Sequence, residues 1–270
     1  LGQEFGGFAR QLELSISRSE AARDAVLELP VGGTAVGSGI NTHPEFGSRV
    51  AKVLADKTGI AFIEAVNHFE ANAQRDALVH SHGELKCIAQ TLFNIANNIR
   101  WLGSGPRCGF YEVKLPSRQP GSSIMPGKVN PVIPESVAMV CARVIGNDAA
   151  ITIAGQSGNF QLNVMLPLVA YDLLQSIDIL SSAARLLADK AIEGFSVDEN
   201  NINQALAKNP ILVTALNRVI GYEQGAKIAK RAYAEGRTVI DVASEMTDLS
   251  VEELQRLLSP AELTKGGVHQ

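Results

Sequence analysis

The sequence predicts an all-α protein, a bundle of long helices followed by a small C-terminal helical domain. Apolar residues recur at three- and four-residue steps through most of the 270 positions, which is the spacing of amphipathic helices. Three of these stretches run beyond about 25 residues, a length that indicates a long bundle rather than an ordinary domain. From about residue 198 the pattern breaks into short helices separated by glycine and proline. We therefore expect domains at residues 1–197 and 198–270.

The first half of the larger domain is predicted to hold three helices. A helical pattern begins at Leu1 and continues to about Leu29, where Pro30 stops it because proline has no N–H to donate. After a glycine-rich connector, a short helix is expected over residues 44–58. A very long helical segment is expected over residues 67–102, and a stretch rich in glycine and proline ends it.

The second half is predicted to hold two more long helices. Residues 110–115 are the only stretch that favours a short pair of strands, and a loop covers about residues 118–133. One helix is expected over residues 134–155, since its leading proline suits the first turn. Another is expected over residues 162–193, with a bend at Pro167.

The composition is typical of a globular protein that binds neither nucleic acid nor membranes. Hydrophobic residues make up 46% of the chain, the net charge is −4, and no extended basic patch is present. No uninterrupted apolar run approaches the roughly 18 residues that span a bilayer. The widely spaced Cys87, Cys108 and Cys141 disfavour a disulfide framework, a zinc site and an iron–sulfur cluster. A reducing compartment, the cytoplasm, fits this cysteine usage.

The histidines do not form a pattern that would bind a metal. His80 and His82 are two residues apart, so they point to different faces of their helix. His43 lies in the connector before a helix start and is expected to be structural. No metal is therefore predicted.

The densest group of chemically useful residues lies in the loop at residues 121–131, which reads GSSIMPGKVNP, and Glu135 follows it. Glycine frees the backbone angle φ and proline fixes it, so these residues shape the loop. Backbone N–H groups of such a segment can bind an anion, and Lys128 and Asn130 add donors for carboxylate oxygens. The loop can therefore close over a small anionic substrate and place a proton acceptor beside a positive charge.

A nucleotide-binding P-loop is excluded by the spacing of this segment. A P-loop has four residues between its glycines and a hydroxyl residue after its lysine. Here five residues separate Gly121 from Gly127, and Val129 stands where the hydroxyl residue would be.

The loop resembles the GSSxMPxKxN signature of the fumarase/aspartase superfamily, and class II fumarases are the branch that it resembles most. The resemblance covers essentially the whole chain. The supporting runs are residues 28–37, 41–45, 99–109, 146–148, 158–164 and 216–222. It implies a long-helix bundle, no cofactor, and reversible anti addition of water to fumarate to give L-malate through an aci-carboxylate intermediate.

The resemblance also implies roles for single residues. Ser122 corresponds to the general base, and Glu135 to the carboxylate that pairs with a site histidine upstream of this chain. Without the resemblance these residues would be a turn hydroxyl and a helix-start acid, and Lys128 would be a solvated charge. The implied substrate contacts are Ser123, Lys128, Val129 and Asn130.

Two alternatives remain open. Aspartate ammonia-lyase shares the loop and the run after it, although Gly127 and residues 69–79 are closer to fumarase. A non-catalytic scaffold is the alternative of another class. The resemblance further implies a homotetramer whose active sites combine several subunits. Because the family's Thr-His pair would lie before Leu1, we expect this chain to be the C-terminal part of a longer protein and inactive alone.

Overall fold

The computed structural model describes residues 1–267 and divides into two compact units. The larger unit holds residues 1–109 and 113–196, and the smaller one begins at Val197 and includes Phe110–Glu112. This short segment joins the C-terminal unit because Asn201 Nδ2 donates to the Phe110 carbonyl at 2.6 Å and the Asp198 N–H donates to the Glu112 carbonyl at 2.9 Å. The sequence did not predict that exchange.

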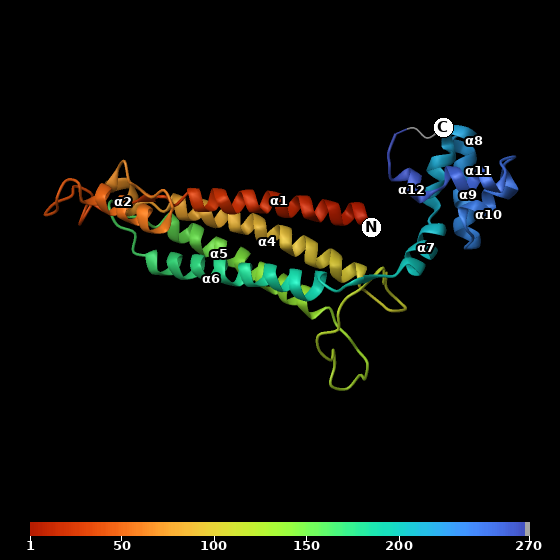
Figure 1. The fold of residues 1–270 in the computed structure, drawn as a ribbon, viewed down its shortest axis with the longest axis horizontal. Helices are drawn as coiled ribbons and strands as arrows, with labels where there is room; N and C mark the ends of the chain where they lie inside the picture. The colour runs from red at the N-terminus through yellow and green to blue at the C-terminus, as the bar shows by residue number, and fades with distance from the viewer. Residues whose placement is uncertain (268–270) are drawn as a thin grey trace. The chain divides into compact units, whose positions relative to one another are not determined.

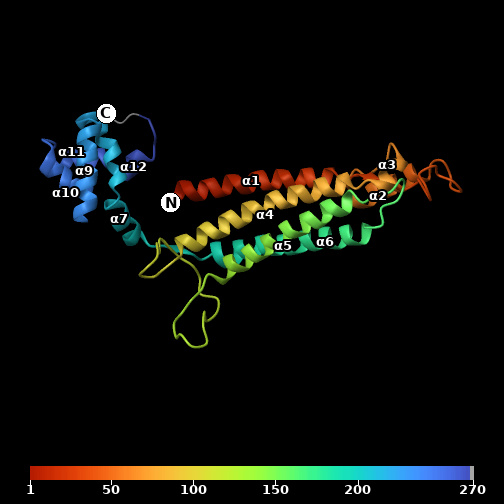
Figure 2. The same cartoon turned by 180° about the vertical axis from the view of Figure 1, so that it is seen from behind.

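Four long helices lie side by side in the larger unit (Figures 1 and 2). They are α1 (Gly2–Asp24), α4 (Asp76–Leu102), α5 (Val132–Gly155) and α6 (Leu166–Leu187). Helix α4 packs against α1 and α5, and α5 packs against α6. The predicted all-α bundle is therefore confirmed.

The core of the bundle is the interface of α4, α5 and α6. Ala89, Leu92, Ile95, Ala96 and Ile99 recur on one face of α4 and are almost completely buried. They meet buried apolar residues of the other two helices: Val137, Cys141, Val144, Leu180, Ala183 and Leu187. Burying one such side chain stabilises the fold by about 2 kcal/mol. Burial also raises the pKa of the Cys141 thiol to about 11, which marks it as a core residue.

The prediction that the first helix continues to Leu29 is wrong by five residues. Helix α1 ends at Asp24, and β1 (Glu28–Leu29) pairs in parallel with β2 (Ile63–Glu64). A proline ring disfavours helical backbone angles at the residue before it, so the segment before Pro30 is extended. The short helix that follows is α2 (Phe46–Thr58), two residues shorter than predicted.

The helical segment predicted over residues 67–102 is interrupted. It divides into α3 (His68–Ala73) and α4, and Gln74 between them is extended. The Arg75 guanidinium donates to the Ala71 carbonyl at 2.6 Å and so replaces a bond that a continuous helix would make. At the start of α3, Asn67 accepts from the N–H groups of Phe69 and Glu70, which is a helix cap.

The helix predicted over residues 162–193 begins and ends differently. Asn163 donates to the Ala154 carbonyl at 2.9 Å, which places residues before Leu166 in a turn. Pro167 then lies in the first turn of α6, where its missing N–H needs no partner, so it makes no bend. At its other end, α6 runs into a π-helix, η1 (Ala188–Ile192).

The strand prediction at residues 110–115 is half right. Strand β3 (Val113–Lys114) lies there, but its partner is β4 (Ser196–Val197) rather than a neighbouring residue. The smaller unit is helical around the buried side chains of Leu216, Ile228, Val242 and Leu254. Its elements are α7 (Glu199–Ala207), η2 (Pro210–Leu216), α8 (Asn217–Ile220), α9 (Tyr222–Glu235), α10 (Val239–Met246), α11 (Val251–Leu257) and α12 (Pro260–Leu263).

Helix α5 is the one element of residues 1–267 that is long and apolar enough to cross a membrane, judged by length and composition. About 33% of its most apolar window is buried within the chain. Core helices of globular proteins pass the same test, and α5 carries the buried polar residues Asn147 and Asp148. Here it serves as a core helix.

A polar network lies inside the bundle and was missed by sequence reasoning. His82, which is completely buried, contacts Asp148 Oδ1 through Nδ1 at 3.0 Å and Ser176 Oγ through Nε2 at 2.9 Å. Lys86 Nζ donates to the second oxygen of Asp148 at 2.6 Å, and Asn147 Nδ2 donates to Ser176 at 3.0 Å. The network joins His82 and Lys86 of α4 to Asn147 and Asp148 of α5 and to Ser176 of α6, so it fixes the register of the three helices.

Replacing His82 with alanine should lower the free energy of unfolding by about 3 kcal/mol, because Asp148 and Ser176 lose a buried partner and a cavity is left. Urea unfolding of the two proteins measures this difference. His80→Ala is the matched control, because His80 lies two residues earlier on the same helix and its side chain is largely exposed. A loss below about 1 kcal/mol would contradict the network's role.

Stability should also depend on the ionisation of Asp148. Burial raises the pKa of the Asp148 carboxyl, but hydrogen bonds from Lys86 and His82 outweigh it and hold that pKa below its ordinary value. A lowered pKa in the folded state stabilises the fold above about pH 4, and this contribution is lost as the pH falls through the folded-state pKa. Urea unfolding from neutral pH to about pH 3 should show a smaller acid loss for Asp148→Asn; equal losses would contradict this assignment.

Candidate active site

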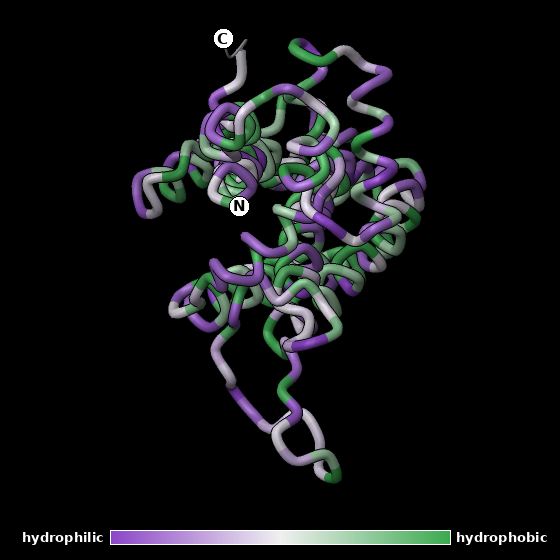
Figure 3. Tube along the Cα trace, turned by 90° about the vertical axis from the view of Figure 1, so that its right-hand side faces the viewer, coloured by the Kyte–Doolittle hydropathy of each residue, from purple (hydrophilic) through white to green (hydrophobic). Residues whose placement is uncertain are grey.

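The candidate loop joins α4 to α5 at one end of the bundle. Figures 1 and 2 show that α1 begins at this same end, where α4 finishes. Figure 3 shows the loop projecting away from the helices, with polar and apolar stretches along it. A substrate can therefore reach its side chains from solvent.

The neck of the loop is closed by two hydrogen bonds. The Gly121 N–H donates to the Lys128 carbonyl at 2.7 Å, and Asn130 Nδ2 donates to the Gly121 carbonyl at 3.3 Å. A Cβ at Gly121 would lie 2.8 Å from the Lys128 carbonyl, so only glycine fits this close approach. Gly127 has a φ of +79°, which other residues rarely adopt.

Ser122 is held by the backbone of the loop. Its hydroxyl oxygen accepts from the N–H groups of Ile124 at 3.2 Å and Met125 at 3.1 Å, and the residue is half-buried. Two donors on one oxygen stabilise negative charge there. The arrangement therefore favours the alkoxide that a serine base requires, although a neutral serine is a weak base.

The remaining predicted residues divide into exposed and half-buried groups. Ser123, Lys128 and Val129 are exposed, and the Ser123 and Lys128 side chains make no hydrogen bond or ion pair within residues 1–267. Glu135 is half-buried in the first turn of α5, and its N–H donates to the Pro131 carbonyl at 3.1 Å. Asn130 uses one amide hydrogen on Gly121, so one is left for a ligand.

Five of the six predicted residues thus lie on one loop, and Glu135 lies in the first turn of the helix that follows it. Within residues 1–267, no cluster of three or more histidine, cysteine, aspartate or glutamate side chains is arranged to hold a metal ion. The polar groups present are oxyanion donors: an ammonium, an amide, hydroxyls and backbone N–H groups. They suit a small carboxylate ligand.

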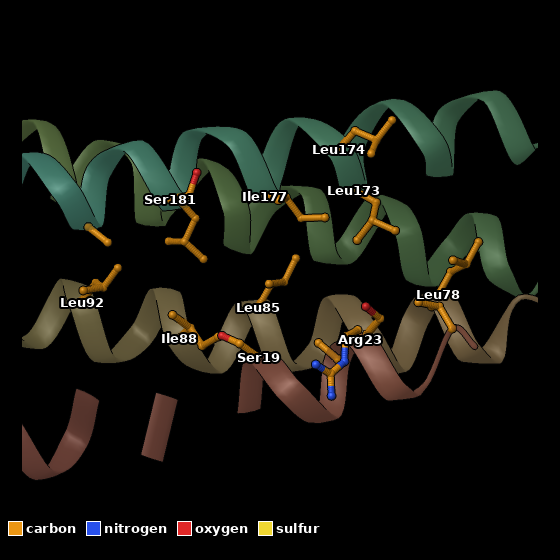
Figure 4. Close-up of a pocket in the computed structure, with 15 residues that line it drawn as sticks. Ser19, Arg23, Leu78, Leu85, Ile88, Leu92, Leu173, Leu174, Ile177 and Ser181 are labelled. Atoms are coloured by element: carbon orange, nitrogen blue, oxygen red, sulfur yellow. The ribbon is translucent and has the colours of Figure 1, made fainter. Parts of the chain in front are cut away.

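A cavity of about 600 Å³ lies elsewhere, between α1, α4 and α6 (Figure 4). No residue of the loop lines it, and Arg23 is the one charged side chain among its lining residues. Leucine and isoleucine dominate its wall: Leu78, Leu85, Ile88, Leu92, Leu173, Leu174, Ile177 and Leu180. On α4 they follow steps of seven, three and four, which is the spacing of a helix-packing seam. The cavity therefore suits another helix and not a dicarboxylate.

Comparison with known protein families gives a match over residues 1–146 of the 270 to a model described as a lyase. The chain belongs to the lyase family that includes the class II fumarases. A second match, to the fumarase C C-terminus, covers residues 212–265 of the smaller unit. The resemblance based on the loop is thereby confirmed.

Individual class II fumarases are similar over nearly the whole chain. A fumarate hydratase class II of Pseudomonas aeruginosa is 54% identical over 99% of this chain and 58% of its own length. One from Xylella fastidiosa is 53% identical over 99% of this chain and 56% of its own length. The chain therefore spans a little more than half the length of these curated relatives.

Solved structures of fumarase-family lyases share the fold. A class II fumarase from Schistosoma mansoni has a TM-score of 0.91 and 33% identity, over 97% of this chain and 58% of its own. A structure described as fumarate lyase:delta crystallin from Brucella melitensis, bound to cobalt, also has a TM-score of 0.91, with 42% identity over 97% of this chain and 57% of its own.

Proposed function

We propose that the whole protein containing this chain is a fumarate hydratase, which interconverts fumarate and L-malate. The observation that carries this proposal is the Ser122 oxygen, held by two backbone N–H groups in a loop that also presents Lys128. The similarity to class II fumarate hydratases supports the same reaction.

In the dehydration direction, Ser122 removes the proton from the carbon next to a malate carboxylate. The N–H groups of Ile124 and Met125 stabilise the alkoxide form of Ser122, and the nearby ammonium charge of Lys128 adds to this effect. No bond to the enzyme forms. The loop therefore acts by stabilising the alkoxide of Ser122, which is a stronger base than the water that would otherwise accept the proton.

The electrons of the broken C–H bond move onto the adjacent carboxylate, which becomes an aci-carboxylate dianion. The donors available for this charge are Lys128, the Ser123 hydroxyl, the Val129 N–H and the free amide hydrogen of Asn130. Fixed donors of this kind lower the barrier by about 3 kcal/mol each. A general acid then protonates the hydroxyl group, which leaves as water, and Ser122 releases to solvent the proton that it took, so that the base is regenerated.

Glu135 acts at the start of α5, where it would orient a histidine supplied by residues outside this chain. The end of the bundle that carries the loop is also where α1 begins (Figure 1). This role belongs to the whole protein.

The exposed apolar surface supports assembly of the whole protein as a homotetramer with composite active sites. On α5, Met139 is 67% and Ile153 57% exposed, and on α6, Leu174 is 65% exposed. Together with the cavity between α1, α4 and α6, these side chains would be covered by further helices from the rest of the protein and from other subunits.

The proposal is tested by assaying the whole purified protein with L-malate and, separately, with L-aspartate, following fumarate absorbance. Turnover of malate with none of aspartate is expected. Turnover of aspartate would assign an ammonia-lyase, and activity with neither substrate would favour a scaffold. The 270-residue chain is assayed in parallel and should be inactive.

A further inference from the structure

Both flanks of the candidate loop lie against η1, the π-helical turn that follows α6. Pro116 and Arg118 on the leading side, and Asn130 and Pro131 on the trailing side, line one small cavity together with Lys190. Ala191, the next residue of η1, also lines it and is only 2% exposed. Helix η1 therefore forms a platform against which both flanks of the loop pack.

Arg118 makes a direct polar contact between the leading flank and this platform. Its guanidinium Nε donates to the Lys190 carbonyl at 2.9 Å. Arg118 lies three residues before Gly121, whose N–H closes the neck, and four before Ser122. A movement at Arg118 would therefore be passed to both positions.

The π-helical turn leaves the Lys190 carbonyl available for this contact. The Glu193 N–H donates to the Ala188 carbonyl at 2.8 Å, a five-residue step, and the helix ends at Ile192. In a continuing α-helix the Lys190 carbonyl would accept from the N–H of Gly194. Gly194 instead has a φ of +86°, which turns the chain away.

We propose that Arg118 is a positioning residue for the reaction: it anchors the leading flank of the candidate loop to η1, which raises the fraction of molecules whose loop neck is ordered before substrate binds. This inference rests on the proposed function of the loop. Arg118 touches no reacting atom in this scheme. It acts through Gly121 and Ser122, by raising the fraction of molecules whose loop can bind a dicarboxylate.

Loss of the anchor should weaken substrate binding more than turnover, because bound substrate itself orders the loop. For Arg118→Met, which keeps the length of the stem without its donors, we expect KM for malate to rise about three- to tenfold, the effect of one net hydrogen bond. The value of kcat should stay within about twofold. Arg118→Lys, which keeps a charged donor, should recover part of the lost affinity.

Hydrogen exchange of the whole protein without substrate provides a readout that does not depend on activity. The Gly121 and Lys128 amides should exchange at least about threefold faster in Arg118→Met than in the parent protein. Arg218→Ala is the matched control, because Arg218 is an exposed arginine of the smaller unit, and it should change neither readout.

Three outcomes separate this inference from the proposed function. Faster exchange with a raised KM supports the anchor. Unchanged exchange, or a fall in kcat with unchanged KM, overturns it. If the parent protein does not turn over malate at all, the proposed function fails, and hydrogen exchange alone decides whether Arg118 anchors the loop.

Discussion

Replacing Ser122 with alanine in the whole protein should lower kcat for malate dehydration about a thousandfold, because the reaction loses its base. Dicarboxylate binding should change little, since Lys128 and Asn130 remain in place. Stopped assays of fumarate formation give kcat, and calorimetric titration with a non-reacting dicarboxylate gives the affinity.

Ser117→Ala is the matched control for this variant. Ser117 is an exposed serine on the leading flank of the same loop, and its loss should leave kcat unchanged. A Ser122→Ala protein with near-normal kcat would remove Ser122 as the base. A variant that loses binding to the same extent as turnover would instead make Ser122 a substrate contact.

Replacing Lys128 with methionine should lower kcat/KM for malate about a hundredfold or more. In the proposed reaction the ammonium group contacts the substrate carboxylate in both the bound and the activated state, but the carboxylate carries an extra charge in the second. Both KM and kcat should therefore change, with the larger part in kcat. Initial rates over a range of malate concentrations separate the two constants.

The control for this prediction is Lys208→Met, which removes an exposed lysine of the smaller unit. Its kcat/KM should match that of the parent protein. If Lys128→Met also keeps its kcat/KM, the cation does not lie at the site, and the donors for the aci-carboxylate must come from elsewhere.

The long helices could be predicted from the sequence because their apolar spacing is local. Leu92, Ile95 and Ile99 face the core as their three- and four-residue steps predict. The errors arose where a distant partner competes with local preference. Leu27 and Leu29 continue a helical pattern, yet their carbonyls accept from the N–H groups of Ile63 and Ala65 at 3.0 and 2.9 Å. Pro30 indicates that the segment before it is extended, but nothing near Leu29 in the sequence identifies residues 63–65 as its partner.

The same limit applies to polar partners in the interior. His82 meets Asp148 and Ser176, which lie 66 and 94 residues away. Spacing within a helix says only which face a residue occupies, so a histidine among apolar neighbours could not be matched with those groups. The contact between Arg118 and the Lys190 carbonyl could not be predicted from the sequence either, because every residue has a backbone carbonyl and the residue type does not show which one accepts.

The residues of the candidate site could be proposed together from the sequence because all but Glu135 lie in one short segment. The residue types from Gly121 to Asn130 indicated an anion-binding loop, and the resemblance added roles for each. The structure adds what residue types cannot show: the Ser122 oxygen accepts from two backbone N–H groups, and the neck closes between Gly121 and Lys128. The roles of the individual side chains remain predictions.

A crystal structure of the whole protein with a bound C4 dicarboxylate tests the central claim most directly. We predict one ligand carboxylate within about 3 Å of Lys128 Nζ, and the carbon that loses its proton facing Ser122 Oγ at a similar distance. A dicarboxylate bound at another site, with residues 121–131 in contact with neither ligand nor neighbouring subunit, would contradict it.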